Sequence, residues 1–201
     1  MAFINALFTS MLDNNLVFCQ LIAMVTVILA AKRPQDGVCF GTMLGCATAA
    51  AGAFGALVYA GFLAPWGVGY YLAPVVYAIL GAAVAFVGGA VAASRKGAAD
   101  RGLALRLVAL LAANAALMGA ALANGVAFDS ATATADVLFG NALGSGLGVF
   151  LAVVLFTSIR ARIDDRLVPH AMRGLPIALV TASLMAMAFT CVAGIAGGLF
   201  V

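Results

Sequence analysis

The sequence predicts an all-α membrane protein with six transmembrane helices, and three observations lead to this prediction. The chain of 201 residues is 66% hydrophobic and 8% charged, too apolar for a soluble domain, which must cover its core with polar surface. All ten Lys and Arg residues fall in or at the edge of three short connecting segments. Six apolar stretches reach the roughly 20 residues that a membrane span needs. They are residues 3–31, 38–62, 69–93, 104–123, 135–159 and 174–200.

The positions of the cations predict the orientation. The basic segments carry Lys32 and Arg33; Arg95, Lys96, Arg101 and Arg106; Arg160, Arg162, Arg166 and Arg173. The alternate segments, at 61–71 and 124–136, carry no cation. Loops that keep Lys and Arg lie in the cytoplasm, because moving these charges across the bilayer is disfavoured. We therefore expect a multi-pass protein of the cytoplasmic (inner) membrane with both termini outside, and no role in binding nucleic acid.

The first stretch is longer than one span needs and contains Asp13, Asn14 and Asn15. This composition predicts that the first helix is interrupted near Asp13–Asn15. Three spans in each half imply that a second, similar half would enter the membrane from the other side, as in the inverted repeats of transport proteins. We expect one membrane domain over residues 1–201, with pseudo-repeats at about 1–100 and 101–201.

Polar side chains inside the apolar stretches need partners, because they cost free energy in hydrocarbon. They are Asn14, Asn15, Gln20, Asn114 and Asn141. One interpretation is that they cap half-helices or line a pathway through the protein. The other is ordinary hydrogen bonding between helices, which contributes about 0.6 kcal/mol on average. For an isolated amide we favour the second, and for Asn14, Asn15 and Asn114 together the first. The candidate pathway near the midplane is Asn14, Asn15, Gln20 and Asn114.

Small residues repeat at four-residue intervals in two of the stretches. Gly140, Gly144 and Gly148 form one series, with Gly146 between them, and Gly41 and Gly45 form the other. Small residues at this spacing let two membrane helices approach closely. We interpret both series as helix-packing surfaces.

The four cysteines do not form a recognisable metal motif. Cys19, Cys39, Cys46 and Cys191 lie in apolar stretches without a CxxC pair or a neighbouring His. Cys39 and Cys46 are separated by about 10 Å of helix, whereas a metal ion holds sulfur ligands at about 2.3 Å. We expect them to act as small hydrophobic side chains. The sequence also lacks catalytic triads, paired carboxylates and phosphate-binding loops, so no catalytic residue and no metal ligand is assigned.

Several motifs occur in the same order as in one family of membrane subunits. They are DNNLVF at 13–18, the Lys32–Arg33 turn, Asn114 with Leu117, Met118 and Gly119, and the C-terminal run at 144–195 with Arg160, Val168–Pro169 and Arg173–Gly174. The chain thereby resembles the six-helix subunits shared by Rnf-type ferredoxin:NAD oxidoreductases and the sodium-pumping NADH:quinone reductase. It is most like the one labelled A in Rnf and E in the reductase.

The resemblance implies a [2Fe–2S] cluster in the membrane, ligated by two cysteines from this chain and two from a partner. The corresponding positions here are Val25 and Ala115. Neither side chain can ligate iron, because ligation needs thiolates. We therefore expect the chain to contribute no cluster ligand, and flavins and iron–sulfur centres to lie in partner subunits.

Two functions are compatible with this sequence. The first is a membrane subunit of a redox-driven pump for Na⁺ or H⁺, part of the electron or ion pathway, without an active site of its own. The second is a transport or scaffold paralogue that kept the fold and lost the electron path. We favour the first. Its expected partners are flavin and iron–sulfur subunits together with a homologous inverted membrane subunit, and Arg160, Arg162, Arg166 and Arg173 form the expected docking surface.

Overall fold

The computed structural model describes residues 2–30, 37–67, 69–94, 114–129, 134–164 and 166–199. These residues form helices and connecting turns, without a β-strand among them. In chain order the elements are α1 (Ala2–Phe8), η1 (Thr9–Asp13), α2 (Met24–Ala30), α3 (Gly37–Val58), η3 (Tyr59–Leu63), α4 (Ala64–Trp66), α5 (Gly69–Ser94), α7 (Ala115–Asp129), α8 (Ala135–Arg162), η4 (His170–Met172) and α9 (Leu175–Leu199).

Four helical segments are long and apolar enough to cross a membrane. They are Gly37–Trp66, Tyr71–Val91, Ala135–Arg162 and Leu175–Val192. Two further apolar helices, Ala2–Asp13 and Ala115–Gly125, are shorter. The all-helical, multi-pass membrane class is thus confirmed. Residues 104–113, the first half of the expected fourth span, lie outside the described ranges, so six spans and external termini stay predictions.

The first apolar stretch is interrupted, as its length and its amides predict. The helix formed by α1 and η1 ends at Asp13, and α2 begins at Met24. Residues 14–23 between them run through turns and bends. Two of these residues, Leu21 and Ala23, have left-handed backbone angles, with φ of 56° and 68°. Left-handed backbone is unfavourable for residues with a Cβ, so surrounding contacts must hold this segment in place.

Two helix ends differ from the sequence-based expectation. The fourth stretch was expected to end at 123, but α7 continues to Asp129. Asn124 stays within the helix because its side-chain amide donates to the carbonyl oxygens of Gly52 (2.9 Å) and Leu138 (3.3 Å). The turn expected at 61–71 is shorter, because the helix continues through α4 to Trp66 and turns at Gly67, where φ is 66°.

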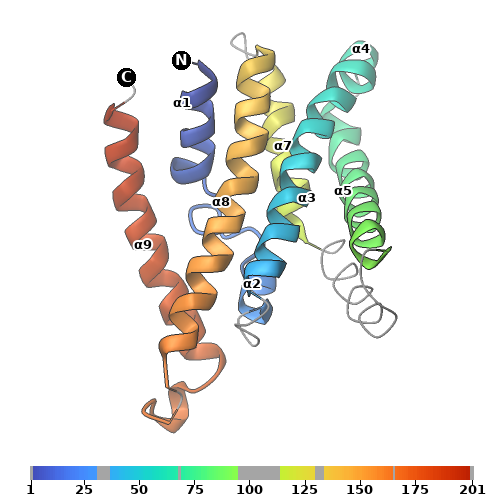
Figure 1. Cartoon of the computed structure of the whole chain (residues 1–201). Coiled ribbons are helices and arrows are strands. Elements are labelled where there is room, and N and C mark those ends of the chain that lie inside the picture. The colour runs from blue at the N-terminus through green and yellow to red at the C-terminus, as the bar shows by residue number, and fades with distance from the viewer. Residues whose placement is uncertain are drawn as a thin grey trace.

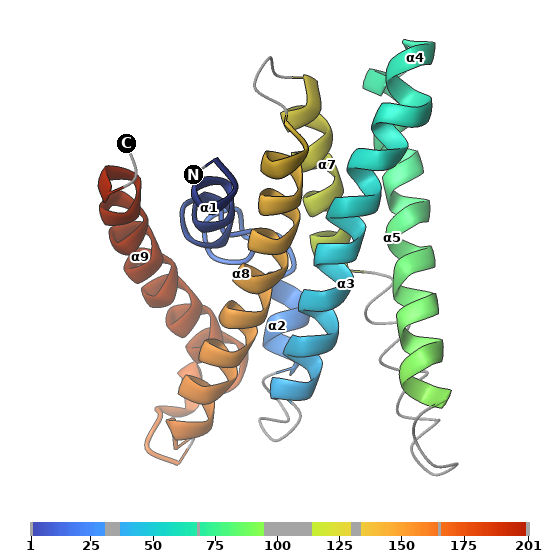
Figure 2. The ribbon, with the colours of Figure 1, turned by 45° about the horizontal axis from the view of Figure 1, so that its top comes forward.

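The helices form one bundle (Figure 1). The pair α3 and α8 packs together at its centre, α1 and η1 lie against α8, and α9 packs on η1. On the other side, α5 and α7 pack on α3, with α7 behind the α3–α8 pair (Figure 2). The start of α1, the end of α9 and the short α4 lie at one end of the bundle, and the loop containing η4 lies at the other (Figure 1).

The two glycine series are helix-packing surfaces, as predicted. A Cβ on Gly146 would lie 2.6 Å from the Gly45 carbonyl oxygen, and one on Gly45 would lie 2.8 Å from the Gly146 carbonyl oxygen. A Cβ on Gly140 would meet the carbonyl oxygen of Phe3 at 2.7 Å. Helix α8 therefore approaches α3 on one face and α1 on the other at backbone distance.

We expect Gly146→Ala to lower the free energy of unfolding by about 1–2 kcal/mol, because overpacking forces two backbones apart. Thermal unfolding of the purified protein in detergent measures this. The matched control is Gly88→Ala in α5, where an added Cβ meets nothing within 4 Å and alanine improves helix propensity by up to about 1 kcal/mol. Equal stability of the two variants would contradict the packing role of Gly146.

Candidate functional site at the helix break

Asn15 organises the break in the first helix. It is fully buried, with 0% exposure, and its side-chain carbonyl oxygen accepts hydrogen bonds from the backbone N–H groups of Val17 (3.0 Å) and Phe18 (3.1 Å). Its amide nitrogen donates to the carbonyl oxygens of Met11 (2.9 Å) and Gly148 (3.1 Å). One side chain thus satisfies backbone groups before the break and within it, and ties the segment to α8. Non-helical backbone at membrane depth requires this kind of compensation.

Asn114 plays the equivalent part at the start of α7. Its side-chain carbonyl oxygen accepts a hydrogen bond from the backbone N–H of Ala116 at 2.9 Å. Its amide nitrogen donates to the hydroxyl oxygen of Thr26 on α2 at 3.0 Å. Both asparagines therefore bind the N–H two residues further along the chain, in the manner of an N-cap. The Thr26 contact joins the start of α7 to the half-helix after the first break.

The break lies level with the middle of α8. Gly148 is at the centre of this 28-residue helix, and a Cβ added there would lie 2.9 Å from the Met11 carbonyl oxygen and 3.0 Å from the Asn15 amide nitrogen. A helix of this length extends about 42 Å at about 1.5 Å per residue. That is enough to cross the hydrocarbon core, of about 30 Å, with both ends outside it.

The other candidate pathway residues lie on the outer side of the break. Asn14 and Gln20 are exposed, and neither side chain forms a hydrogen bond within the described part of the chain. Leu21 and Val25 beside them are 63% and 72% exposed. Asn15 and Asn114, in contrast, have structural partners. From the sequence alone, these four amides form one set. In the structure, Asn15 and Asn114 are capping residues, whereas the side chains of Asn14 and Gln20 have no hydrogen-bond partner among the described residues.

Sequence inspection missed several polar partners. Thr26 binds Asn114, and Ser10 donates to the side-chain carbonyl oxygen of Asn141 at 2.8 Å. Asn124, expected in a loop, is 1% exposed and joins α7 to α3 and α8. Thr and Ser side chains in apolar helices commonly hydrogen-bond to the backbone of their own helix. Their presence in the sequence therefore did not indicate contacts with other helices. Asn124 was detectable only as an amide adjoining an apolar run.

The residues at the cluster positions do not fit an iron–sulfur centre. Val25 and Ala115 are both exposed, and each adjoins a member of the Thr26–Asn114 hydrogen bond. Their side chains have no donor atom. The nearest sulfur in sequence, Cys19, is partly buried, and its Sγ lies 3.5 Å from the Leu12 carbonyl oxygen. No group of three or more His, Cys, Asp or Glu side chains among the described residues is placed to hold a metal.

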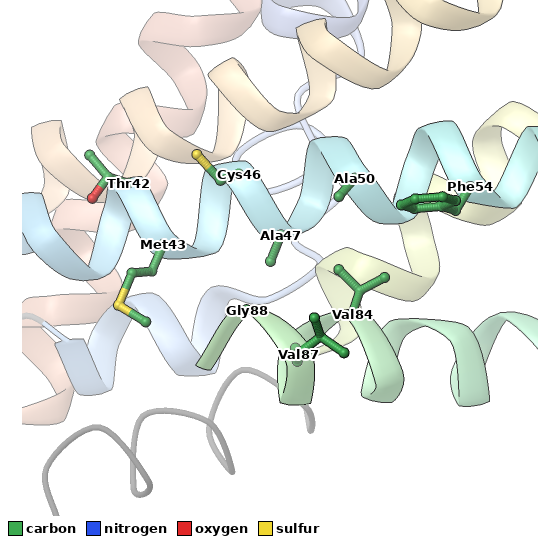
Figure 3. A pocket seen from close by; sticks show the side chains of 10 residues that line it. Thr42, Met43, Cys46, Ala47, Ala50, Phe54, Val84, Val87 and Gly88 are labelled. Carbon is green, nitrogen blue, oxygen red and sulfur yellow. The ribbon is translucent and has the colours of Figure 1, made fainter. Parts of the chain in front are cut away.

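A groove between α3 and α5 has a volume of about 590 Å³ (Figure 3). Its lining is almost entirely apolar and includes Met43, Phe54 and Val84. The Thr42 hydroxyl at its edge donates to the Cys39 carbonyl oxygen at 2.8 Å. None of the described residues that line the groove is charged. The groove therefore offers mainly surface for apolar contact.

The basic loop after α8 is partly held by its own contacts. Arg173 donates through Nε to the Val168 carbonyl oxygen at 2.9 Å and through a terminal nitrogen to the Arg166 carbonyl oxygen at 3.3 Å. The Asp164 carboxylate accepts the Arg166 backbone N–H at 2.9 Å. Arg160 is half-buried, whereas Arg162 and Arg166 are exposed. The loop thus presents exposed cations on a locally ordered backbone.

Comparison with known proteins matches the family described as Rnf-Nqr subunit, membrane protein, over residues 3–196. The chain belongs to this family. It is 30% identical over 190 residues to the A subunit of the Na(+)-translocating ferredoxin:NAD(+) oxidoreductase complex of Acetobacterium woodii, covering 94% of this chain and 95% of the relative. The A subunit of an ion-translocating oxidoreductase complex of Azoarcus is 30% identical over 185 residues, 92% of each chain.

A second branch of the Rnf-Nqr family matches a shorter region. The E subunit of the Na(+)-translocating NADH-quinone reductase of Chlamydia trachomatis is 49% identical over 53 residues, 26% of this chain and 22% of the relative. The resemblance inferred from the motifs is thus confirmed for both branches. Membership of the Rnf-Nqr family agrees with the bundle of apolar helices.

Proposed function

We propose that this chain is a membrane subunit of an Rnf- or Nqr-like complex that couples electron transfer to the movement of Na⁺ or H⁺. Two relatives that align with 94% and 92% of this chain are named as subunits of ion-translocating oxidoreductase complexes. The observation that carries the proposal is the interruption of the first helix at Asn15, level with the middle of α8. Beside it stands the hydrogen bond from Asn114 to Thr26, which joins the half-helix α2 to the start of α7. Broken helices at this depth are how transport proteins build sites inside the membrane.

The proposed topology has six spans, with both termini outside the cytoplasmic membrane and pseudo-repeats at about 1–100 and 101–201. The shared hydrogen-bonding of Asn15 and Asn114 supports two related halves. All three basic segments would then lie in the cytoplasm.

Reporter fusions test the topology. We expect cytoplasmic signals at Lys96 and Arg166 and external signals at Ser130 and the C-terminus, because basic loops are retained inside. A cysteine placed at Arg101 should be closed to a membrane-impermeant thiol reagent in intact cells. Labelling of that cysteine from outside would overturn this orientation.

The proposed partners are subunits that carry flavin and iron–sulfur centres, together with a homologous, inverted membrane subunit. The exposed polar surface at Asn14 and Gln20 supports a membrane partner, because uncompensated polar groups do not face lipid stably. Together with Asn15 and Asn114, these residues form the proposed pathway region. This chain would supply no iron ligand, since Val25 and Ala115 stand at the cluster positions.

A non-redox transport or scaffold role is the alternative, and the missing ligands at Val25 and Ala115 are what favours it. Purification of the native complex separates the two functions. Co-purification of flavoprotein subunits, with ferredoxin- or NADH-linked activity, supports the redox complex. A lone oligomer without redox centres supports the scaffold.

We expect charge reversal of Arg162 and Arg166 together to weaken assembly with cytoplasmic subunits at least several-fold, because both cations are exposed and complementary charges guide docking. Quantitative pull-down of the complex measures it. Arg173→Glu is a separate variant, since its guanidinium holds the loop itself. Normal assembly with Arg162 and Arg166 both reversed would leave the loop as a topology signal only.

A further inference from the structure

Asp13 stands apart from the other acidic residues of the chain. All seven are aspartates, at positions 13, 36, 100, 129, 136, 164 and 165. Six of them lie in connecting segments or within two residues of the end of an apolar stretch. Asp13 lies deep inside the first stretch, as the last residue of η1. An ionisable residue at such a position is costly and generally marks a functional site.

The contacts of the neighbouring residues define the depth of Asp13. The carbonyl oxygen of Met11 and the amide of Asn15, on either side of Asp13, both lie against Gly148 at the middle of α8. The charged residues of α8 are Asp136, Arg160 and Arg162. The nearer two are each twelve residues from Gly148, which is about 18 Å along the helix. No charge of α8 thus reaches Asp13.

Among the described residues, the other elements that pack on η1 supply no counter-charge either. These elements are α1 and α9, and their sequences, AFINALF and LPIALVTASLMAMAFTCVAGIAGGL, contain no charged residue. The titratable side chains of these elements and of the break are the thiols of Cys19 and Cys191. One carboxyl oxygen of Asp13, Oδ1, is shielded from solvent and has no hydrogen-bond partner in the described structure.

The local backbone field favours a cation at this carboxyl. Asp13 is at the C-terminal end of the helix formed by α1 and η1, where the aligned peptide dipoles carry partial negative charge. An anionic side chain there adds to this charge, and a bound cation offsets both. In the break that follows Asp13, the side chains of Asn14 and Gln20 are exposed and form no hydrogen bond in the described chain.

We propose that the Asp13 carboxyl is a binding site for a monovalent cation, H⁺ or Na⁺, at the centre of the membrane. The chemistry is the same for both ions: a positive charge meets a carboxyl oxygen that has no other partner. The role of this ion in transport rests on the proposed function, whereas its binding does not. Asn14 and Gln20 provide further oxygen atoms on the outer side of the break.

A hydrophobic carbodiimide tests the site in the purified native complex, because this reagent modifies membrane carboxyl groups in their protonated form. Mass spectrometry locates the modified aspartate. We expect modification at Asp13, lost in Asp13→Asn, restored in Asp13→Glu and unchanged in Asp136→Asn, which is the matched control in the first turn of α8. The rate is measured against pH, and at fixed pH against NaCl with KCl as the ionic-strength control.

Each outcome decides the proposal. Protection by NaCl of at least several-fold relative to KCl identifies Na⁺. Modification that continues at about pH 7 without sodium protection identifies H⁺, because a solvent-exposed carboxyl is ionised and unreactive at that pH. Absence of modification at Asp13 at about pH 7 in sodium-free buffer overturns the site. If the complex couples redox chemistry to ion movement but the carbodiimide does not react with Asp13, the site is refuted and the proposed function stands. If the reaction at Asp13 depends on cations but the complex has no redox activity, the site stands and the proposed function is refuted.

Discussion

We expect Asn15→Ala to lower the free energy of unfolding by about 3 kcal/mol or more. The substitution leaves the buried N–H groups of Val17 and Phe18 and the carbonyl oxygens of Met11 and Gly148 without their partner. A buried polar group left unsatisfied costs about 1–3 kcal/mol, and partial rearrangement of the break would recover some of the total. Chemical unfolding of the protein in mixed detergent micelles, followed by helical circular dichroism, measures the change.

Asn14→Ala is the matched control, because this neighbouring amide is exposed and has no side-chain partner in the described residues. We expect its stability to stay within about 0.5 kcal/mol of the unmodified chain. Asn15→Asp keeps the acceptor for Val17 and Phe18 but places a buried carboxyl oxygen against the carbonyl oxygens of Met11 and Gly148, so it should be no more stable than Asn15→Ala. Similar stability of Asn15→Ala and Asn14→Ala would contradict the capping role of Asn15.

The sequence was sufficient to predict the interruption of the first helix and the glycine contacts. Both signals are local: an excess of length with adjacent amides at Asp13–Asn15, and small residues at four-residue spacing from Gly140 to Gly148. The structure confirms both, with the break at 14–23 and the close approach of Gly146 to Gly45. Patterns of this kind can be recognised in a short stretch of sequence, without knowing which other helices pack against it.

Features that depend on distant partners could not be predicted. The end of α7 was misplaced because Asn124 looks like a loop residue until Gly52, 72 positions away, supplies its acceptor. The role of Thr26 was hidden for a similar reason. Its hydroxyl donates to the Ala23 carbonyl oxygen at 2.6 Å, as threonines in helices commonly do, and it also accepts from Asn114. The first contact is local and the second is tertiary.

The contact between Thr26 and Asn114 gives the second large expected effect. We expect Asn114→Ala to lower the free energy of unfolding by about 2 kcal/mol, because it removes the cap on the Ala116 N–H and the donor to Thr26. Thr26→Val should cost about 1 kcal/mol, since valine keeps the shape and loses the hydroxyl. A double-mutant cycle measures their coupling, which we expect at about 0.6 kcal/mol, the usual value for a hydrogen bond between membrane helices.

The control for this cycle is Asn124→Ala combined with Thr26→Val. Asn124 is another buried amide of α7, but its partners are Gly52 and Leu138, so its effect should add to that of Thr26→Val without coupling. Thr26→Ser, which keeps the hydroxyl, should retain most of the coupling with Asn114. A coupling of zero for Thr26 and Asn114 would mean that the two half-helices are held together by packing alone. The hydrogen bond between Thr26 and Asn114 would then not help to determine how the two halves of the chain pack together.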